Sequence, residues 1–168
     1  MNQIHVALAG NPNAGKSSIF NALTGSRQHV GNWPGKTVEK KEGYFQQDGY
    51  EVKVVDLPGT YSLTAFSPEE VIARDYILHE KPDVVVTVLD SANLERNLYL
   101  AVQVLELGVP VIAALNMSDV AESRGIKIDQ ERLGLALGSP VVRTVASKGE
   151  GVKDLANAII KFKQEKKA

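Results

Sequence analysis

Apolar and polar residues follow two spacings along this chain, which indicates strands and helices in alternation. Continuous apolar runs at 84–89 and 109–115 are short and rich in Val, Ile and Leu, as is typical of buried strands. Elsewhere apolar residues recur at helical spacing, as in Ile19, Phe20 and Leu23, which predicts a helix with one face on a sheet. This alternation predicts an α/β fold with a mostly parallel sheet and helices on both faces.

Turn and cap residues set the bounds of the predicted elements. Asp48-Gly49 is a strong hairpin signal, so the two strands around it are expected to be antiparallel. Ser67-Pro68, followed by two acidic residues, predicts the start of a helix. The polar, glycine-containing stretch 25–36 is expected to be a loop. The predicted strands are 4–9, 37–45, 50–57, 83–89, 109–115 and 140–144, and the predicted helices are 16–24, one from Ser67, 94–108, 129–137 and 151–163.

Composition narrows the class of protein. With 168 residues, 43% hydrophobic and 23% charged, the chain suits one globular domain. A net charge of −1 argues against non-specific nucleic-acid binding, and the lack of cysteine excludes disulfides and thiolate metal sites. No apolar run approaches the roughly 20 residues that span a bilayer, and no signal peptide is evident. The three histidines share no spacing, so no iron site is indicated.

Candidate chemistry begins directly after the first predicted strand, in a segment named here the P-loop (10–18), with the sequence GNPNAGKSS. Its G-x-x-x-x-G-K-S pattern aims backbone N–H groups and a helix N-terminus at one point, which favours phosphate. Lys16 can reach the β- and γ-phosphates, and Ser17 can bind Mg²⁺. An ordinary glycine turn is disfavoured because both the strand and the helix are predicted. The candidate nucleotide-binding residues are Gly10, Asn11, Pro12, Asn13, Ala14, Gly15, Lys16, Ser17 and Ser18.

A second motif, DLPGT, follows the third predicted strand. Asp56 is placed to bind Mg²⁺ through water, and Gly59 lets its N–H approach the γ-phosphate, with Leu57 and Pro58 between them. A plain turn is the alternative, and it loses weight because a P-loop precedes the motif. The next residue is Thr60, whose side chain is too short to orient an attacking water, and no glutamine lies next to it. Slow intrinsic hydrolysis is therefore expected.

Two motifs near the C-terminal half point to guanine. In NMSD, which runs from Asn116 through Met117 and Ser118 to Asp119, the final carboxylate can accept both guanine N1–H and the exocyclic amine. Adenine would leave such a carboxylate unpaired, so the motif selects against ATP. The alternative is a helix cap at Ser118 or Asp119. In VASKG, the backbone N–H of Ala146 or Ser147 is a candidate for guanine O6, with Lys148 beside them.

The ordered set GNPNAGKS, GKTVE, DLPG, NMSD and VASKG is similar to translation-factor-class GTPases of the Ras-like fold. Within that class, the stretches 31–43, 56–63 and 90–100 closely resemble the N-terminal G domain of the bacterial ferrous iron transporter FeoB. The resemblance covers essentially the whole chain and implies a six-stranded sheet with about five helices. It implies one GTP-binding domain over 1–168, the cytoplasmic part of an inner-membrane protein whose helical regulatory and transmembrane regions lie outside this sequence.

The same resemblance implies two mobile switches, 27–37 and 59–69, with Thr37 closing on Mg²⁺ and the γ-phosphate. It also makes Asn13 the ligand of an activating K⁺. Alternatives stay open: Thr37 can simply begin a strand, Asn13 can simply tolerate an unusual backbone, and Trp33 can be either packed or exposed. The implied catalytic residues are Asn13, Lys16, Thr37 and Gly59, and the implied nucleotide contacts in the first switch are Gly35, Lys36, Thr37, Val38 and Glu39.

The sequence therefore favours a regulatory GTPase domain, with GTP and GDP as substrate and product, Mg²⁺ as cofactor and K⁺ as activator. The expected partner is the remainder of the transporter, homo-oligomers are possible, and no nucleic acid is expected. One alternative is an RNA-associated GTPase of the Era or MnmE kind, which shares the PNAGKS loop. Another is a nucleotide-binding module that hardly turns over, which the threonine at position 60 allows.

Overall fold

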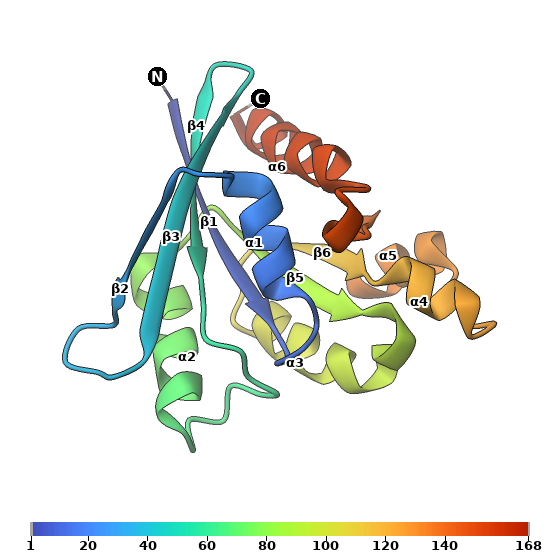
Figure 1. Ribbon diagram of the computed structural model, residues 1–168, viewed down its shortest axis with the longest axis horizontal. Helices are drawn as coiled ribbons and strands as arrows, with labels where there is room; N and C mark the ends of the chain where they lie inside the picture. Colours follow the sequence, from blue (N-terminus) through green and yellow to red (C-terminus); the bar gives the residue numbers. More distant parts are fainter. Residues whose placement is uncertain (1, 168) are drawn as a thin grey trace.

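The computed structural model describes residues 2–167, and helices cover both faces of one twisted sheet (Figure 1). The order of the strands across the sheet is β2-β3-β4-β1-β5-β6-β7. The strands are β1 (Asn2–Gly10), β2 (Gln28–Asn32), β3 (Glu39–Gln47), β4 (Tyr50–Asp56), β5 (Val84–Asp90), β6 (Val111–Asn116) and β7 (Val141–Arg143). The helices are α1 (Lys16–Thr24), α2 (Pro68–Glu80), α3 (Leu94–Glu106), α4 (Ser118–Ser123), α5 (Gln130–Leu137) and α6 (Val152–Lys167), with short 3₁₀ turns at Ser91–Asn93 and Ala146–Lys148.

Strand β1 lies in the centre of the sheet and pairs in parallel with β4 and β5. Its side chains alternate between two cores, as the strand period of two requires. Ile4, Val6 and Leu8 pack in the cluster that contains residues of α1 and α6, whereas Ala7 and Ala9 pack in the cluster beneath α2 and α3. All five are buried. This double burial explains why the sequence of β1 is an almost continuous apolar run.

The predicted fold class is confirmed, and so is the hairpin between the second and third predicted strands. β3 and β4 pair antiparallel, with Gln47 opposite Tyr50. Asp48 and Gly49 have φ values of 53° and 81°, as the type I′ hairpin turn requires. Ser67 caps α2 as predicted, by accepting a hydrogen bond from the backbone N–H of Glu70 at 3.2 Å.

The number of strands and the number of helices both differ from the sequence prediction. Among residues 2–167 the sheet has seven strands instead of six, because Gln28–Asn32, expected to be loop, forms the edge strand β2 against β3. All five residues of β2 are exposed, so its sequence carries no alternation of apolar and polar residues. The segment is a strand because it pairs with β3. Six α-helices replace the expected five, since α4 was not predicted. No helix in the same range is long and apolar enough to cross a membrane.

Candidate nucleotide-binding site

The P-loop joins the C-terminal end of β1 to α1, at the edge of the sheet where parallel strands place their ligands. Gly15 is the N-cap of α1 and has a φ of 89°, a conformation that favours glycine. No side chain caps this helix, and its first turn has no acidic residue. The N–H groups of the first turn therefore face outward at the positive end of the helix dipole, an arrangement suited to an anion.

Asn116 fixes the P-loop to the rest of this edge. Its side-chain amide donates a hydrogen bond to the carbonyl of Ala14 at 3.0 Å. Its side-chain oxygen accepts bonds from the Thr144 hydroxyl at 2.9 Å and the Ala146 backbone N–H at 3.1 Å. A Cβ at Gly15 would lie 2.2 Å from the amide nitrogen of Asn116, so only glycine fits there. This buried residue thus locks three chain segments into one unit.

Lys16 and Asp56 form an ion pair with 2.5 Å between Nζ and Oδ1, and both side chains are about nine-tenths buried. The pair joins the P-loop to the DLPGT segment, as the predicted shared site requires. A cavity, named here the P-loop cavity, opens directly above it. Its lining residues are Asn11, Pro12, Asn13, Gly15, Lys16, Ser17, Ser18 and Gly59.

The base side of the edge is built by α4 and the turn at Ala146–Lys148. Met117 has a φ of 59° and is the N-cap of α4, so neither Ser118 nor Asp119 caps the helix. The Ser118 hydroxyl donates to the carbonyl of Leu115 at 2.8 Å. The carboxylate of Asp119 lies 3.4 Å from the ammonium of Lys148, and both remain partly exposed. The cap alternative therefore fails, and Asp119 stays available to a ligand.

Residues 35–39 lie apart from the other predicted site residues. The loop that contains them joins β2 to β3, the two outermost strands on one side of the sheet, and is displaced sideways from β1 by the width of β3 and β4 (Figure 1). Thr37 is exposed and lies before β3, which begins at Glu39, so it does not open a strand. Of the described residues that line the P-loop cavity, none comes from this loop. Trp33, whose role the sequence left open, is packed, with 6% of its surface exposed.

The segment after Gly59 is held in place by several contacts. The Thr60 backbone N–H donates to the carbonyl of Gly10 at 3.1 Å, and the threonine itself is buried. Its side chain is thus unsuited to orienting water, as its length already indicated. The Arg96 guanidinium lies 4.8 Å from the centroid of the Tyr61 ring. Both residues line a small polar cavity on the other side of Asn13.

Glu70 organises the same segment from the first turn of α2. Its carboxylate accepts hydrogen bonds from the hydroxyls of Ser62 at 2.6 Å, Thr64 at 2.8 Å and Ser67 at 3.0 Å. These bonds, that from Ser62 foremost, lower the pKa of Glu70 from 4.5 to about 2 because they favour the charged form. The carboxylate is therefore ionised over the physiological range and fixes the loop before α2.

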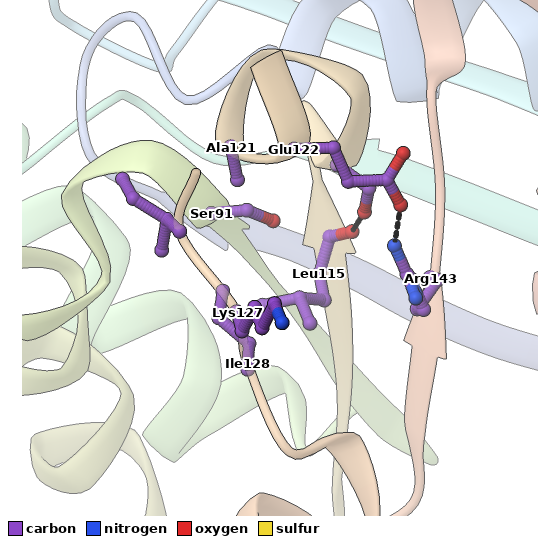
Figure 2. A pocket seen from close by; sticks show the side chains of 9 residues that line it. Ser91, Leu115, Ala121, Glu122, Lys127, Ile128 and Arg143 are labelled. Atoms are coloured by element: carbon purple, nitrogen blue, oxygen red, sulfur yellow. Dashed lines mark hydrogen bonds and ion pairs between the residues drawn. The ribbon is translucent and has the colours of Figure 1, made fainter. Parts of the chain in front are cut away.

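A separate cavity lies beneath α4 (Figure 2). Arg143 and Glu122 form an ion pair at one side of it, Ser91 lies on the opposite side, and Leu115 lies between them. The Ser91 hydroxyl donates to the carbonyl of Asn116 at 2.5 Å. No P-loop residue lines this cavity, so it does not hold the phosphates.

Sequence reasoning missed three contributors to the site. Thr144 completes the hydrogen bonds of Asn116, and Gln103 accepts the Leu63 backbone N–H at 2.7 Å. The third, Tyr76, packs against Trp33 with 5.5 Å between ring centroids. None of them belongs to a motif, and each acts through a contact distant in sequence. The only sequence signal close to one of them was the resemblance of the stretch 90–100, near Gln103, to a known family.

The fold and the four motifs at one edge define a Ras-like P-loop domain. The N-terminal family of ferrous iron transport protein B matches residues 4–159. The chain therefore belongs to the FeoB family, and it corresponds to the G domain of that family. This assignment does not favour the Era or MnmE alternative.

Relatives of known sequence and structure agree. The chain is 51% identical over 167 residues to the Fe(2+) transporter FeoB of Escherichia coli, covering 97% of this chain and 22% of the relative. It is 50% identical to the FeoB G domain of Methanococcus jannaschii, with a TM-score of 0.86, covering 96% of this chain and 98% of that one. The T. maritima FeoB cytosolic domain in its GMPPNP form is 51% identical, with a TM-score of 0.91, covering 94% and 63%. The chain thus spans about a fifth of its curated relatives.

Proposed function

We propose that this domain binds guanine nucleotides and hydrolyses GTP to GDP and phosphate. The single observation that carries the proposal is the unit built on Asn116, which ties a phosphate-binding loop to a base-recognition loop within one rigid edge. The FeoB cytosolic domain of T. maritima has been solved in GDP and GMPPNP forms. Over the aligned part, which is 94% of this chain and 63% of the T. maritima chain, 51% of the residues are identical, and this supports the same ligand class here.

The residues present divide the recognition of the nucleotide. Backbone N–H groups of the P-loop and Lys16 hold the phosphates, after Lys16 leaves its bond to Asp56. Asp119 reads the two donors of the guanine edge. Because the N–H of Ala146 is already given to Asn116, Ser147 is the stronger candidate for guanine O6. Lys148 stays beside Asp119 and packs along the base.

The residues also fit a bound Mg²⁺. A serine hydroxyl and a carboxylate are hard oxygen ligands, and Ser17 lines the P-loop cavity while Asp56 lies beneath it, bound to Lys16. Ser17 would bind the ion directly and Asp56 through water. Thr37 would join them only after its loop moves. The ion supplies charge neutralisation to the phosphates, and Gly59 brings a backbone N–H towards the γ-phosphate.

Asn13 is the candidate K⁺ ligand. It is exposed, has a φ of 73° and lines the cavities on both sides of the loop. The alternative role, in which Asn13 only tolerates a left-handed backbone, is compatible with binding of K⁺ because asparagine can do both. Thr60 offers no water-orienting amide, so a cation at Asn13 is the proposed source of added positive charge. In the whole protein, the nucleotide state of this domain would regulate ferrous iron uptake by the membrane region.

The experiment is steady-state GTP hydrolysis with Mg²⁺, in KCl and in NaCl at equal ionic strength. We expect faster turnover in KCl, and we expect Asn13→Ala to abolish this stimulation while GDP affinity stays within about twofold. Asn93→Ala, at another exposed asparagine of the neighbouring polar cavity, is the matched control and should keep it. Stimulation that persists in Asn13→Ala would refute the assigned ion site. No turnover in either salt would favour the binding-module alternative.

A further inference from the structure

Trp33 occupies an aromatic position that the nucleotide site does not use. Its ring packs edge-on against Tyr76 of α2, with 5.5 Å between centroids and an interplanar angle of 76°. The ammonium of Lys40 in β3 covers its other side, 4.8 Å from the ring centroid. Tyr76 is in turn fixed by a 2.5 Å hydrogen bond between its hydroxyl and Nε2 of His5 in β1. Trp33 is thus docked in the core beneath α2 and α3.

The backbone ties the rest of the loop to this docked ring. The N–H of Trp33 donates to the carbonyl of Val38, and the N–H of Lys36 donates to the carbonyl of Trp33, both at 2.9 Å. The loop 33–38 is therefore closed on itself, with Thr37 exposed at its outer side. Since the two ends of the loop are bonded to each other, Thr37 cannot travel far while Trp33 stays docked.

The topology shows how far Thr37 must travel. Thr37 directly precedes β3, and β3 and β1 are separated by two strand spacings, which amount to about 10 Å. β3 pairs Lys41 with Asp56, whose neighbour across β4 is Leu8 of β1. The start of β3 therefore lies at the same edge of the sheet as the P-loop, but two strands to the side. Thr37 faces the correct edge and needs a sideways movement to reach the P-loop cavity.

One detail weakens the docked position. The indole Nε1 of Trp33 is buried and has no hydrogen-bond partner among residues 2–167. A buried donor without a partner loses the bond that it makes to water, so this group opposes docking while the ring packing favours it. Because these two contributions oppose each other, the docked and undocked positions of the loop lie close in free energy. A ligand can then select one of the two positions.

We propose that Trp33 is a positioning residue that sets the preference of the site for nucleoside triphosphate over diphosphate. While docked on Tyr76, it holds Thr37 away from the phosphates. Binding of the triphosphate with Mg²⁺ draws Thr37 in and releases Trp33, whereas the diphosphate leaves it docked. The inference rests on the proposed function and adds a residue outside every nucleotide-binding motif.

The chain offers a direct optical test because Trp33 is its single tryptophan. We expect GMPPNP with Mg²⁺ to shift Trp33 emission to longer wavelength and to increase its quenching by acrylamide, and GDP to change neither. Calorimetry on the same samples measures binding of each nucleotide independently. Binding of GMPPNP with unchanged emission overturns the inference alone. Failure to bind either nucleotide overturns the proposed function, and the inference falls with it.

Substitution tests the energetic claim. Trp33→Leu should raise the ratio of GMPPNP to GDP affinity about 5- to 50-fold, the usual range of such couplings, with GDP affinity unchanged within about twofold. Tyr76→Leu should act in the same direction and expose Trp33 before any ligand is added. Tyr76→Phe keeps the ring that Trp33 touches and should restore most of the wild-type ratio. An unchanged ratio in both leucine variants would overturn the proposal.

A matched control separates this effect from a general loosening of the sheet edge. Val30 lies in β2, three residues before Trp33, and 54% of its surface is exposed. Val30→Ala should leave the affinity ratio and Trp33 emission unchanged. An equal effect from Val30→Ala would show that any change at this edge shifts the ratio, and would also overturn the role assigned to Trp33.

Discussion

The two sides of the P-loop cavity are built on different principles. On the base side, Asn116 is buried and makes three hydrogen bonds, one to the P-loop and two to the stretch 144–146. On the switch side, the loop 33–38 and the segment 60–67 are held by an aromatic contact, a cation over a ring and an exposed carboxylate. Buried, saturated hydrogen bonds fix one geometry, whereas the switch side has no such network and depends on ring packing and on hydrogen bonds of a partly exposed loop, which permit several. From this difference we expect the base side to keep one geometry and the switch side to move when a nucleotide binds.

The largest effect is expected from Asn116→Ala, which removes the hydrogen bonds that hold the base side together. The substitution leaves the Ala14 carbonyl, the Thr144 hydroxyl and the Ala146 N–H without partners in a buried setting. We expect a loss of about 3–5 kcal/mol in the free energy of unfolding, measured by urea denaturation, together with loss of nucleotide binding. Asn93→Ala, which removes an exposed asparagine, should cost below about 1 kcal/mol. An equal loss of unfolding free energy in the two variants would contradict the role of Asn116 as a clamp, that is, as the residue that joins the P-loop to the stretch 144–146.

Asp119→Asn tests the base side without disturbing its frame. The amide can no longer accept both guanine donors, so GTP affinity should fall about 100-fold or more, and affinity for xanthosine triphosphate should rise. Calorimetry measures the affinity of the variant for GTP and for xanthosine triphosphate. Glu122→Gln is the matched control, because Glu122 lies on the same helix but pairs with Arg143. Unchanged guanine preference in Asp119→Asn would remove the role assigned to this carboxylate.

The smallest effect is expected on the switch side, at Glu70. Its pKa is lower in the folded state than in the unfolded chain, so its contribution is complete above pH 4.5 and is lost as the pH falls towards about 2. Glu70→Gln should leave global stability almost unchanged but speed amide exchange in the segment 62–67 at neutral pH. The wild type should approach the variant only below pH 4. A difference that persists at pH 2 would contradict the assignment.

Much of the candidate site could be predicted from sequence because its motifs are local. The P-loop needs a strand, a glycine turn and a helix in succession, and these elements form where the pattern placed them. The type I′ turn at Asp48-Gly49 is likewise local. β2 escaped prediction for the opposite reason: its five residues are all exposed, and only the free edge of β3 makes them a strand. α4 was missed because six residues are too few for a periodic signal.

The sequence by itself determined the class of fold, and it predicted the place of the phosphate loop and a preference for guanine, because each depends on residues within a few positions of one another. Tertiary structure alone decided that Asn116 is a clamp, that Trp33 is docked on Tyr76, and that Thr37 lies two strands away from the P-loop cavity. These facts depend on which side chains meet across distant segments. Packing and strand order set those meetings, and no local pattern encodes them.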